Sequence, residues 1–214
     1  MSFLLPLLLL VVFAACVGFL YREGMWANGI RLINVVTAAL LATNFWEPLA
    51  RLLEDMLGAS FTYLYDFLSL WLLFAVIYLA FHLVTNKVSR VKVRFLAIVN
   101  KIGGGVLAAA VGWVLVSFTL MTLHTAPLGE KFFFGGFDPN ANMLFGLAPD
   151  HQWLAFMGHV SRGAFSKGAA EGEPAGFDPE HKFIDTYRLR RLSLQAQLQS
   201  AGSIKPSGGI VPRR

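Results

Sequence analysis

Long runs of apolar residues without a formal charge dominate the first 123 residues of the chain. The runs that contain no Lys, Arg, Asp or Glu are Ser2–Tyr21, Leu32–Trp46, Phe67–Asn86 and Ile102–Gly129. A helix needs about 20 mostly apolar residues to cross the hydrocarbon core of a bilayer. The second run reaches this length when it is extended back to Met25, provided that Arg31 reaches the headgroups with its long side chain. The pattern therefore predicts four transmembrane helices, over about 3–20, 25–44, 62–84 and 102–123.

A shorter amphipathic segment, residues 46–57, follows the second predicted helix. Its apolar residues Trp46, Leu49, Leu53, Met56 and Leu57 recur at helical spacing, and the charged Arg51, Glu54 and Asp55 lie on the other side. Pro48 is suited to the first turn of a helix. We expect a short interfacial helix that lies flat on the outer surface of the membrane. A re-entrant segment that feeds a pore is the alternative.

The composition changes after Leu123, which divides the chain into three parts. These are a membrane domain over 1–123, an aromatic-rich segment over 124–167 and a polar end over 168–214. Within the aromatic-rich segment, Pro149 and Asp150 introduce a predicted helix. The polar end reads as a linker, a polar helix over about 179–199 and a disordered stretch rich in Ser, Gly and Pro. The expected fold class is an all-α integral membrane protein whose tail is partly helical and partly disordered.

Small residues recur at every fourth position in two of the predicted spans, so each row lies along one face of its helix. The rows are Gly104, Ala108 and Gly112, with Gly105 and Ala109 beside them, in the fourth span, and Asn34, Ala38 and Ala42 in the second. Hydrophobic burial gives little drive between helices in lipid, so they associate through close backbone approach and interhelical hydrogen bonds. We therefore predict that the glycine face receives another helix, either from the same bundle or from a second copy.

The charges that flank the spans predict one orientation in the membrane. Basic residues gather in the first and third loops, namely Arg22, Lys87, Arg90, Lys92, Arg94 and Lys101. The loop between the second and third spans has the opposite balance, with Glu47, Glu54, Asp55 and Asp66 against Arg51. Cytoplasmic loops carry the excess of Lys and Arg in multi-pass proteins. The amino terminus and the carboxyl-terminal tail are therefore expected outside the cytoplasm.

The overall composition strengthens the membrane assignment and excludes two other classes. Hydrophobic residues make up 56% of the chain and charged residues 14%, whereas soluble domains carry about 25% charged residues. The single cysteine excludes an intramolecular disulfide framework. The isoelectric point near 9.6 comes with no dense basic face, so nucleic acid is not an expected partner.

No pattern predicts a catalytic, cofactor-binding or metal site. The five histidines show neither an HExxH motif nor Cys/His ligand spacing. The glycines at 103–105 lack the Lys-Ser/Thr pair of a phosphate-binding loop. Asp66 and His82 lie near the ends of the third span, where we expect water-accessible boundary positions rather than a proton or ion relay. We therefore expect a protein that is not an enzyme.

Residues 1–123 resemble the colicin V production protein (CvpA) family of bacterial inner-membrane proteins. The resemblance lies in the four spans in this order, the Gly18–Gly24 turn with Arg22, and the join Asn100-Lys101-Ile102-Gly103-Gly104 that is continued by Gly105 and Gly112. Asn100 stands where the family usually has Asp, and the first span lacks an opening Asp. The resemblance implies a multi-spanning inner-membrane protein linked to toxin production or export, with no catalytic residue to transfer.

These observations lead to one expected function and two alternatives. The expected function is an accessory or scaffold protein of the bacterial envelope that acts by helix association, with membrane lipid and with other envelope proteins or a second copy as partners. The first alternative is a small oligomeric channel or transport subunit lined by Asn34, Thr37 and the 46–57 helix. The weaker alternative is an envelope-facing enzyme that depends on His151 or His159.

Overall fold

The computed structural model describes residues 3–58, 62–89, 93, 95–128, 137, 142–162, 177–178 and 181–203. Its regular elements in these ranges are all helical: α1 (Leu4–Leu20), a 3-10 turn (Tyr21–Glu23), α2 (Met25–Leu57), α3 (Thr62–Val88), α4 (Ala97–Thr125), α6 (Pro149–Ser161) and α7 (Phe183–Ser203). Within the described part, the helices long and apolar enough to cross a membrane are α1, with its 3-10 turn, and α2, α3 and α4. The predicted all-α membrane fold with four spans is confirmed.

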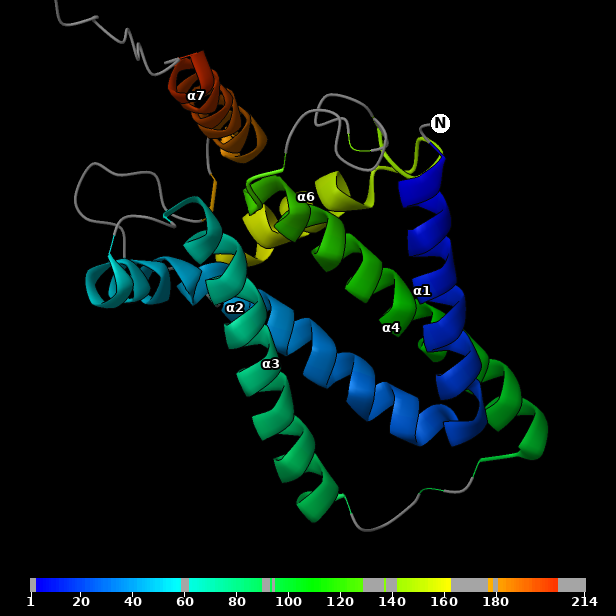
Figure 1. Cartoon of the computed structure of the whole chain (residues 1–214). Coiled ribbons are helices and arrows are strands. Elements are labelled where there is room, and N and C mark those ends of the chain that lie inside the picture. The colour runs from blue at the N-terminus through cyan, green and yellow to red at the C-terminus, as the bar shows by residue number, and fades with distance from the viewer. Residues whose placement is uncertain are drawn as a thin grey trace, which may run out of the picture.

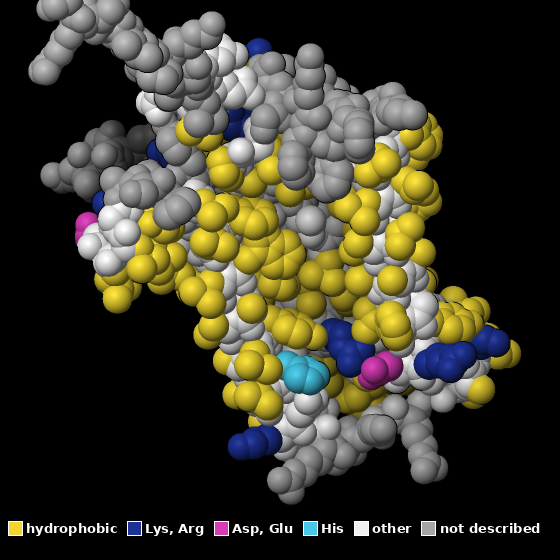
Figure 2. All heavy atoms as spheres, in the orientation of Figure 1, with side chains coloured by type: hydrophobic (Ala, Val, Ile, Leu, Met, Phe, Trp, Pro, Cys, Tyr) yellow, Lys and Arg dark blue, Asp and Glu magenta, His cyan; other side chains and the backbone are white. Residues whose placement is uncertain are grey.

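α4 is the central helix of the structure. It packs against α1, α2, α3, α6 and α7, while α2 and α3 pack directly against each other. Figure 1 shows α1 and α3 on opposite sides, with α2 and α4 running between them. Large apolar side chains point away from the protein on α1 and α3, as in Leu7, Val11, Leu72 and Val76, each at least half exposed. Such surface is stable when lipid chains cover it, and Figure 2 shows it along both outer helices.

α2 is one continuous helix, which corrects the prediction of a span ending at Asn44 and a separate short helix from Trp46. Its 33 residues rise about 50 Å, more than the hydrocarbon thickness of about 30 Å. Pro48 lies inside the helix and, having no N–H, leaves the carbonyl of Asn44 without its usual donor. A proline bends a helix in this way without ending it, and Figure 1 shows the last turns of α2 running in a new direction.

The glycine face of α4 is filled by helices of the same chain. A Cβ atom added at Gly104 would lie 3.2 Å from the carbonyl carbon of Gly24, and one at Gly112 would lie 3.0 Å from the ring of Phe13. At Gly105 the nearest atom would be in the ring of Tyr21, at 3.2 Å. Ala108, in the same row, is fully buried, whereas Ala109 is half-buried. The sequence leaves open whether the helix on this face belongs to the same bundle or to a second copy. These contacts come from the same chain, from α1 and the turn that follows it.

A buried amide fixes this close approach. The Asn28 Nδ2 group of α2 donates to the carbonyl oxygen of Gly104 and to that of Leu20, both at 2.9 Å. Asn28 is fully buried, where a hydrogen bond is worth more than at a wet surface. One side chain therefore joins the end of α1, the start of α2 and the glycine face of α4.

The small-residue row of α2 faces α3 and the core. Ala38 and Ala42 are fully buried among the apolar residues of the main core. Asn34 is also buried, and its Nδ2 group donates to the Thr85 hydroxyl of α3 at 2.9 Å. This hydrogen bond joins α2 to α3, and Asn34 also lines a cavity of about 740 Å³ beside it.

Candidate functional site

The candidate site lies at the end of the membrane bundle that contacts the tail helices. Helices α6 and α7 lie at the end formed by the start of α3, the last turn of α4 and the bend of α2 (Figure 1). The start of α1 lies at this same end, where the Phe3 ring is 5.4 Å from that of Phe145. Met143 and Leu144 bury their side chains against Leu5 of α1. The segment before α6 is thereby attached to the first helix of the chain.

A buried pair, His124 and Asp150, joins α4 to α6. His124 Nε2 lies 2.8 Å from Asp150 Oδ2, and neither side chain has any exposed surface. Asp150 stands in the first turn of α6, directly after Pro149 at the helix start, where proline is favoured and a carboxylate is stabilised by the helix dipole. Burial raises the pKa of the Asp150 carboxyl, but the hydrogen bond and the charges of His124 and His151 outweigh it and lower the pKa.

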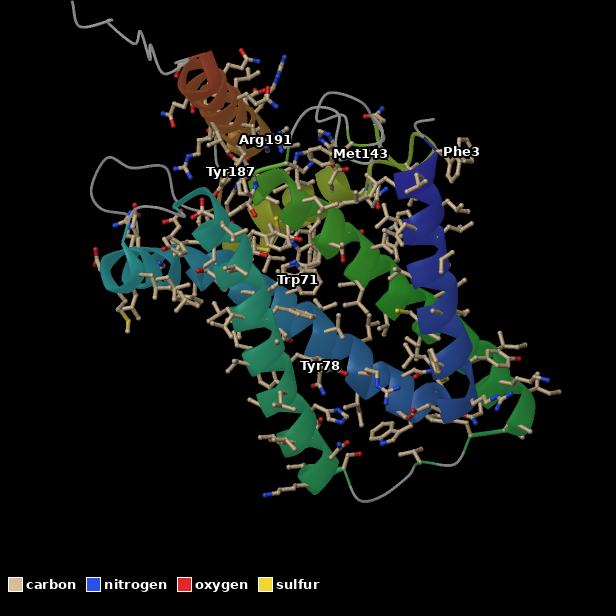
Figure 3. The ribbon with its side chains drawn as sticks, in the orientation of Figure 1. Phe3, Trp71, Tyr78, Met143, Tyr187 and Arg191 are labelled. Carbon is tan, nitrogen blue, oxygen red and sulfur yellow. The ribbon has the colours of Figure 1, made fainter. Side chains whose placement is uncertain are left out.

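Helix α7 is attached to the same end through three side chains. The Tyr187 hydroxyl donates to Asp66 of α3 at 2.9 Å, and Arg190 donates to the same carboxylate oxygen at 2.8 Å. Arg191 donates to the carbonyl oxygen of His124 at 3.0 Å. Figure 3 shows Tyr187 and Arg191 reaching from α7 toward the bundle. His124 therefore binds α6 with its imidazole and α7 with its backbone carbonyl.

The environment of Tyr187 keeps its phenol protonated. Burial is the main cause that raises the pKa of Tyr187, and the neighbouring Asp66 carboxylate raises it further. A protonated phenol can donate to a carboxylate, and hydrogen bonds to charged acceptors are stronger than neutral ones. The Tyr187–Asp66 bond is accordingly a stable attachment of the tail.

A cavity of about 470 Å³ opens between α7 and the bundle. Its floor includes Trp46, Tyr65 and Thr125. Charged side chains of both signs line it, namely Glu47, Arg51, Glu54, Asp66, Arg190 and Arg191. We call the surface that lines this cavity the tail platform. Basic, acidic and apolar side chains all line the cavity. It is therefore suited to a partner surface that presents acidic, basic and apolar side chains.

The buried His124–Asp150 pair is closed to a substrate in this structure. The His124–Asp150 pair has the geometry of a base and its orienting carboxylate, but a reacting group cannot reach two side chains without exposed surface. The described residues also contain no group of three or more His, Cys, Asp or Glu placed to hold a metal ion. His151 and His159 are both exposed, which leaves them outside a dry pocket. The pair is thus a structural contact between membrane helix and tail.

The residues predicted to set the topology lie at the opposite end of the bundle. Arg22 is in the turn after α1, Lys87 is near the end of α3 and Lys101 is near the start of α4, all exposed. These helix ends lie together away from the tail helices (Figure 1). Arg90, Lys92 and Arg94 fall outside the described residues, as do the predicted linker at 168–176 and the chain after 203.

Sequence reasoning missed the His124–Asp150 pair. The two residues are 26 positions apart, and no local periodicity connects the end of a membrane helix to the start of a tail helix. The only signal was that each is a titratable residue at a helix end. Asp66 was predicted as a boundary residue of the third span, but its partners on α7 are more than 120 positions away.

The comparison with protein families gives a match over most of the bundle. The model of a family described as "Colicin V production protein" matches residues 5–136. This range covers the four membrane helices except Leu4, the first residue of α1, and it stops before α6. No curated protein and no solved structure gives a significant match.

Proposed function

Because the chain belongs to the colicin V production protein family, we propose that it is a non-enzymatic accessory protein of the bacterial inner membrane. In this role it supports toxin production or export by binding another envelope protein at the tail platform. Membership of this family links the chain to toxin production. The four apolar helices support a multi-pass membrane location. The partner, the membrane and the orientation are part of the proposal.

The observation that carries the proposal is the attachment of both tail helices to the bundle. Buried or partly buried polar contacts join α6 to α4 through Asp150 and His124, and α7 to α3 through Tyr187 and Asp66. A surface held in place before binding loses less conformational freedom when a partner arrives. The tail platform is therefore a better binding surface than a mobile tail of the same composition.

The glycine face of α4 is not part of the proposed binding surface. Gly104 and Gly112 are already covered by Gly24 and Phe13 of the same chain, so a second helix would have to displace them. We therefore do not propose the small-residue row of α4 as the surface that binds another protein. The polar tail helices, with their charged cavity, take that role instead.

We propose that the tail platform is extracytoplasmic. The support is the basic character of the opposite end, where the third loop carries five Lys or Arg and no acid between Lys87 and Lys101. The positive-inside rule assigns such a loop to the cytoplasm. Because the chain crosses the membrane four times between its start and the tail, the start of α1 and the tail platform lie on the same side.

A charge-reversal experiment tests this function. Arg51 lines the cavity and is exposed, whereas Arg188 on α7 is also exposed and does not line the cavity. We expect Arg51→Glu to lower toxin release from a host that carries the toxin genes, with Arg188→Glu as the matched control. Both variants are first compared with the wild type for amount in the membrane fraction.

A crosslinking arm makes the partner visible. A photoreactive amino acid at position 51 is expected to give a discrete protein adduct in membranes, and the same group at position 188 is not. The proposal is wrong if Arg51→Glu leaves toxin release at the wild-type level, or if both reversals reduce it equally.

A further inference from the structure

An apolar groove runs between the two outer helices, at a distance from the tail platform. Phe19 of α1 and Phe74 and Tyr78 of α3 form its walls, and Val111 and Leu115 of α4 form its floor. Its volume is about 700 Å³, within the range of about 300–1,000 Å³ that is typical of ligand pockets. Figure 2 shows hydrophobic side chains along this hollow. The groove opens sideways, toward the region that lipid occupies.

One end of the groove is charged. Glu23, Arg31 and His82 line the groove and also line a second cavity of about 740 Å³. The Arg31 guanidinium and the Glu23 carboxylate are 3.1 Å apart. Figure 2 shows an acidic, a basic and a histidine side chain together at this end. The apolar groove is therefore continuous with a second cavity through three shared polar residues.

The second cavity, which we call the polar chamber, lies where the membrane helices end, between the turn after α1, the start of α2 and the end of α3. It is lined by Arg22, Trp26 and Ser89, among other residues. The Trp26 indole donates to the Ser89 hydroxyl at 3.0 Å, and tryptophan is enriched at membrane interfaces because it has both an apolar body and a polar N–H. The chamber thus has the depth at which a lipid headgroup lies.

The polar chamber favours an anionic group. Arg22 and Arg31 carry two positive charges against the single carboxylate of Glu23, and Arg22 has no ion-pair partner within the described ranges. The guanidinium group binds phosphate oxygens in a planar, bidentate manner. Basic pockets between membrane helices on the cytoplasmic side are a known means of binding anionic headgroups.

We propose that the groove and the polar chamber together bind one anionic phospholipid. An acyl chain lies along the groove, and the headgroup phosphate lies in the polar chamber near Arg22 and Arg31. A helix of a second copy is a poorer occupant, because it would cover Glu23, Arg31 and His82 with apolar surface and would desolvate their charges without a counter-charge. A phospholipid supplies the apolar length and the negative end in one molecule.

The test uses the full-length protein in detergent micelles doped with single lipids. Thermal stability is measured with phosphatidylglycerol, with phosphatidylcholine of identical acyl chains, and with inorganic phosphate alone. We expect phosphatidylglycerol to give the largest stabilisation. Replacing Arg22 by Gln is expected to weaken its apparent affinity about fivefold, the typical effect of one arginine near an anionic lipid surface.

Four further variants separate a specific site from a general charge effect. Arg31→Lys keeps the positive charge without the bidentate geometry and is expected to retain part of the affinity, whereas Arg31→Gln is expected to lose more of it. Arg188→Gln, at an exposed residue on α7 that lines none of the three cavities, is the matched control and is expected to leave the lipid affinity unchanged. Ala15→Trp fills the groove from α1, at a residue that lines it, and is expected to weaken binding of both lipids.

Several outcomes would overturn the proposal. Equal stabilisation by the two lipids would assign the groove to ordinary bilayer lipid. A full effect from inorganic phosphate alone would assign the site to a free anion. Stabilisation that rises with protein concentration, together with a dimer in mass measurements, would assign the groove to a second copy. The assay does not involve toxin release, so its result is independent of the function proposed for the tail platform.

Discussion

Replacing Gly104 by alanine tests how closely α4 approaches the turn before α2. The added Cβ atom would lie 3.2 Å from the carbonyl carbon of Gly24, and 3.3 Å from its Cα atom and from the Met25 nitrogen. Ordinary contacts of a Cβ atom lie at 3.4–4 Å. All three neighbours are backbone atoms, which cannot rotate away as a side-chain tip can. The helices must therefore move apart by a few tenths of an ångström.

Three contributions set the size of the change in the free energy of unfolding. Overpacking in a well-filled core costs typically about 1–3 kcal/mol. Separation of the helices also weakens the hydrogen bond from Asn28 to the Gly104 carbonyl, and such a bond contributes about 0.5–1.5 kcal/mol. Alanine recovers about 1 kcal/mol because it favours the helical backbone more than glycine does. We expect Gly104→Ala to lower the free energy of unfolding by about 2 kcal/mol.

The matched control is Gly18→Ala in α1. A Cβ atom at Gly18 meets nothing within 4 Å, so only the helix preference changes, and we expect equal or slightly greater stability. The assay is unfolding in mixed micelles with increasing sodium dodecyl sulfate, followed by the fluorescence of the five tryptophans. If the two alanine variants unfold at the same detergent fraction, the close approach of α4 to Gly24 does not contribute to stability and the reasoning fails.

Three further predictions concern the tail. Tyr187→Phe removes a donor to the Asp66 carboxylate, so amide hydrogen exchange in α7 should increase about tenfold or more; unchanged exchange would contradict this attachment. The lowered pKa of Asp150 means that its contribution to stability is complete above the unfolded value of about 3.9 and decreases as the pH falls toward the folded value. Asp150→Asn should therefore flatten the acid side of the stability profile, and a profile that stays equally steep would exclude this carboxyl as its source. In a Cys16→Ser background, a cysteine placed after Ser203 should react with a membrane-impermeant maleimide added to spheroplasts, and protection from the reagent would reverse the proposed orientation.

The membrane helices were predictable because hydrocarbon imposes a length and a composition on any helix that crosses it. The predicted ends at Val84 and Ile102 were less accurate, since α3 continues to Val88 and α4 begins at Ala97. Hydropathy falls at the headgroups, whereas a helix continues as long as its backbone bonds are satisfied. The same reason explains α2, in which the backbone passes Pro48 without stopping.

The contacts between distant parts of the chain were not predictable from local pattern. The spacing of Gly104 and Gly112 indicated a close neighbour, but it could not identify Gly24 and Phe13 as that neighbour. Residues spaced four apart define one face of a helix. Which helix packs against that face depends on how the other helices are arranged. The pairing of His124 with Asp150 required the same missing information.

The central position of α4 has a consequence for how the protein is made. α2 and α3 contact each other directly and are adjacent in the chain, so they can form a hairpin as soon as the ribosome has released both. α1 makes its main helix contacts with α4 and has to wait in the bilayer until translation of α4 is complete. Insertion of α4 therefore converts a separate helix and a hairpin into one bundle.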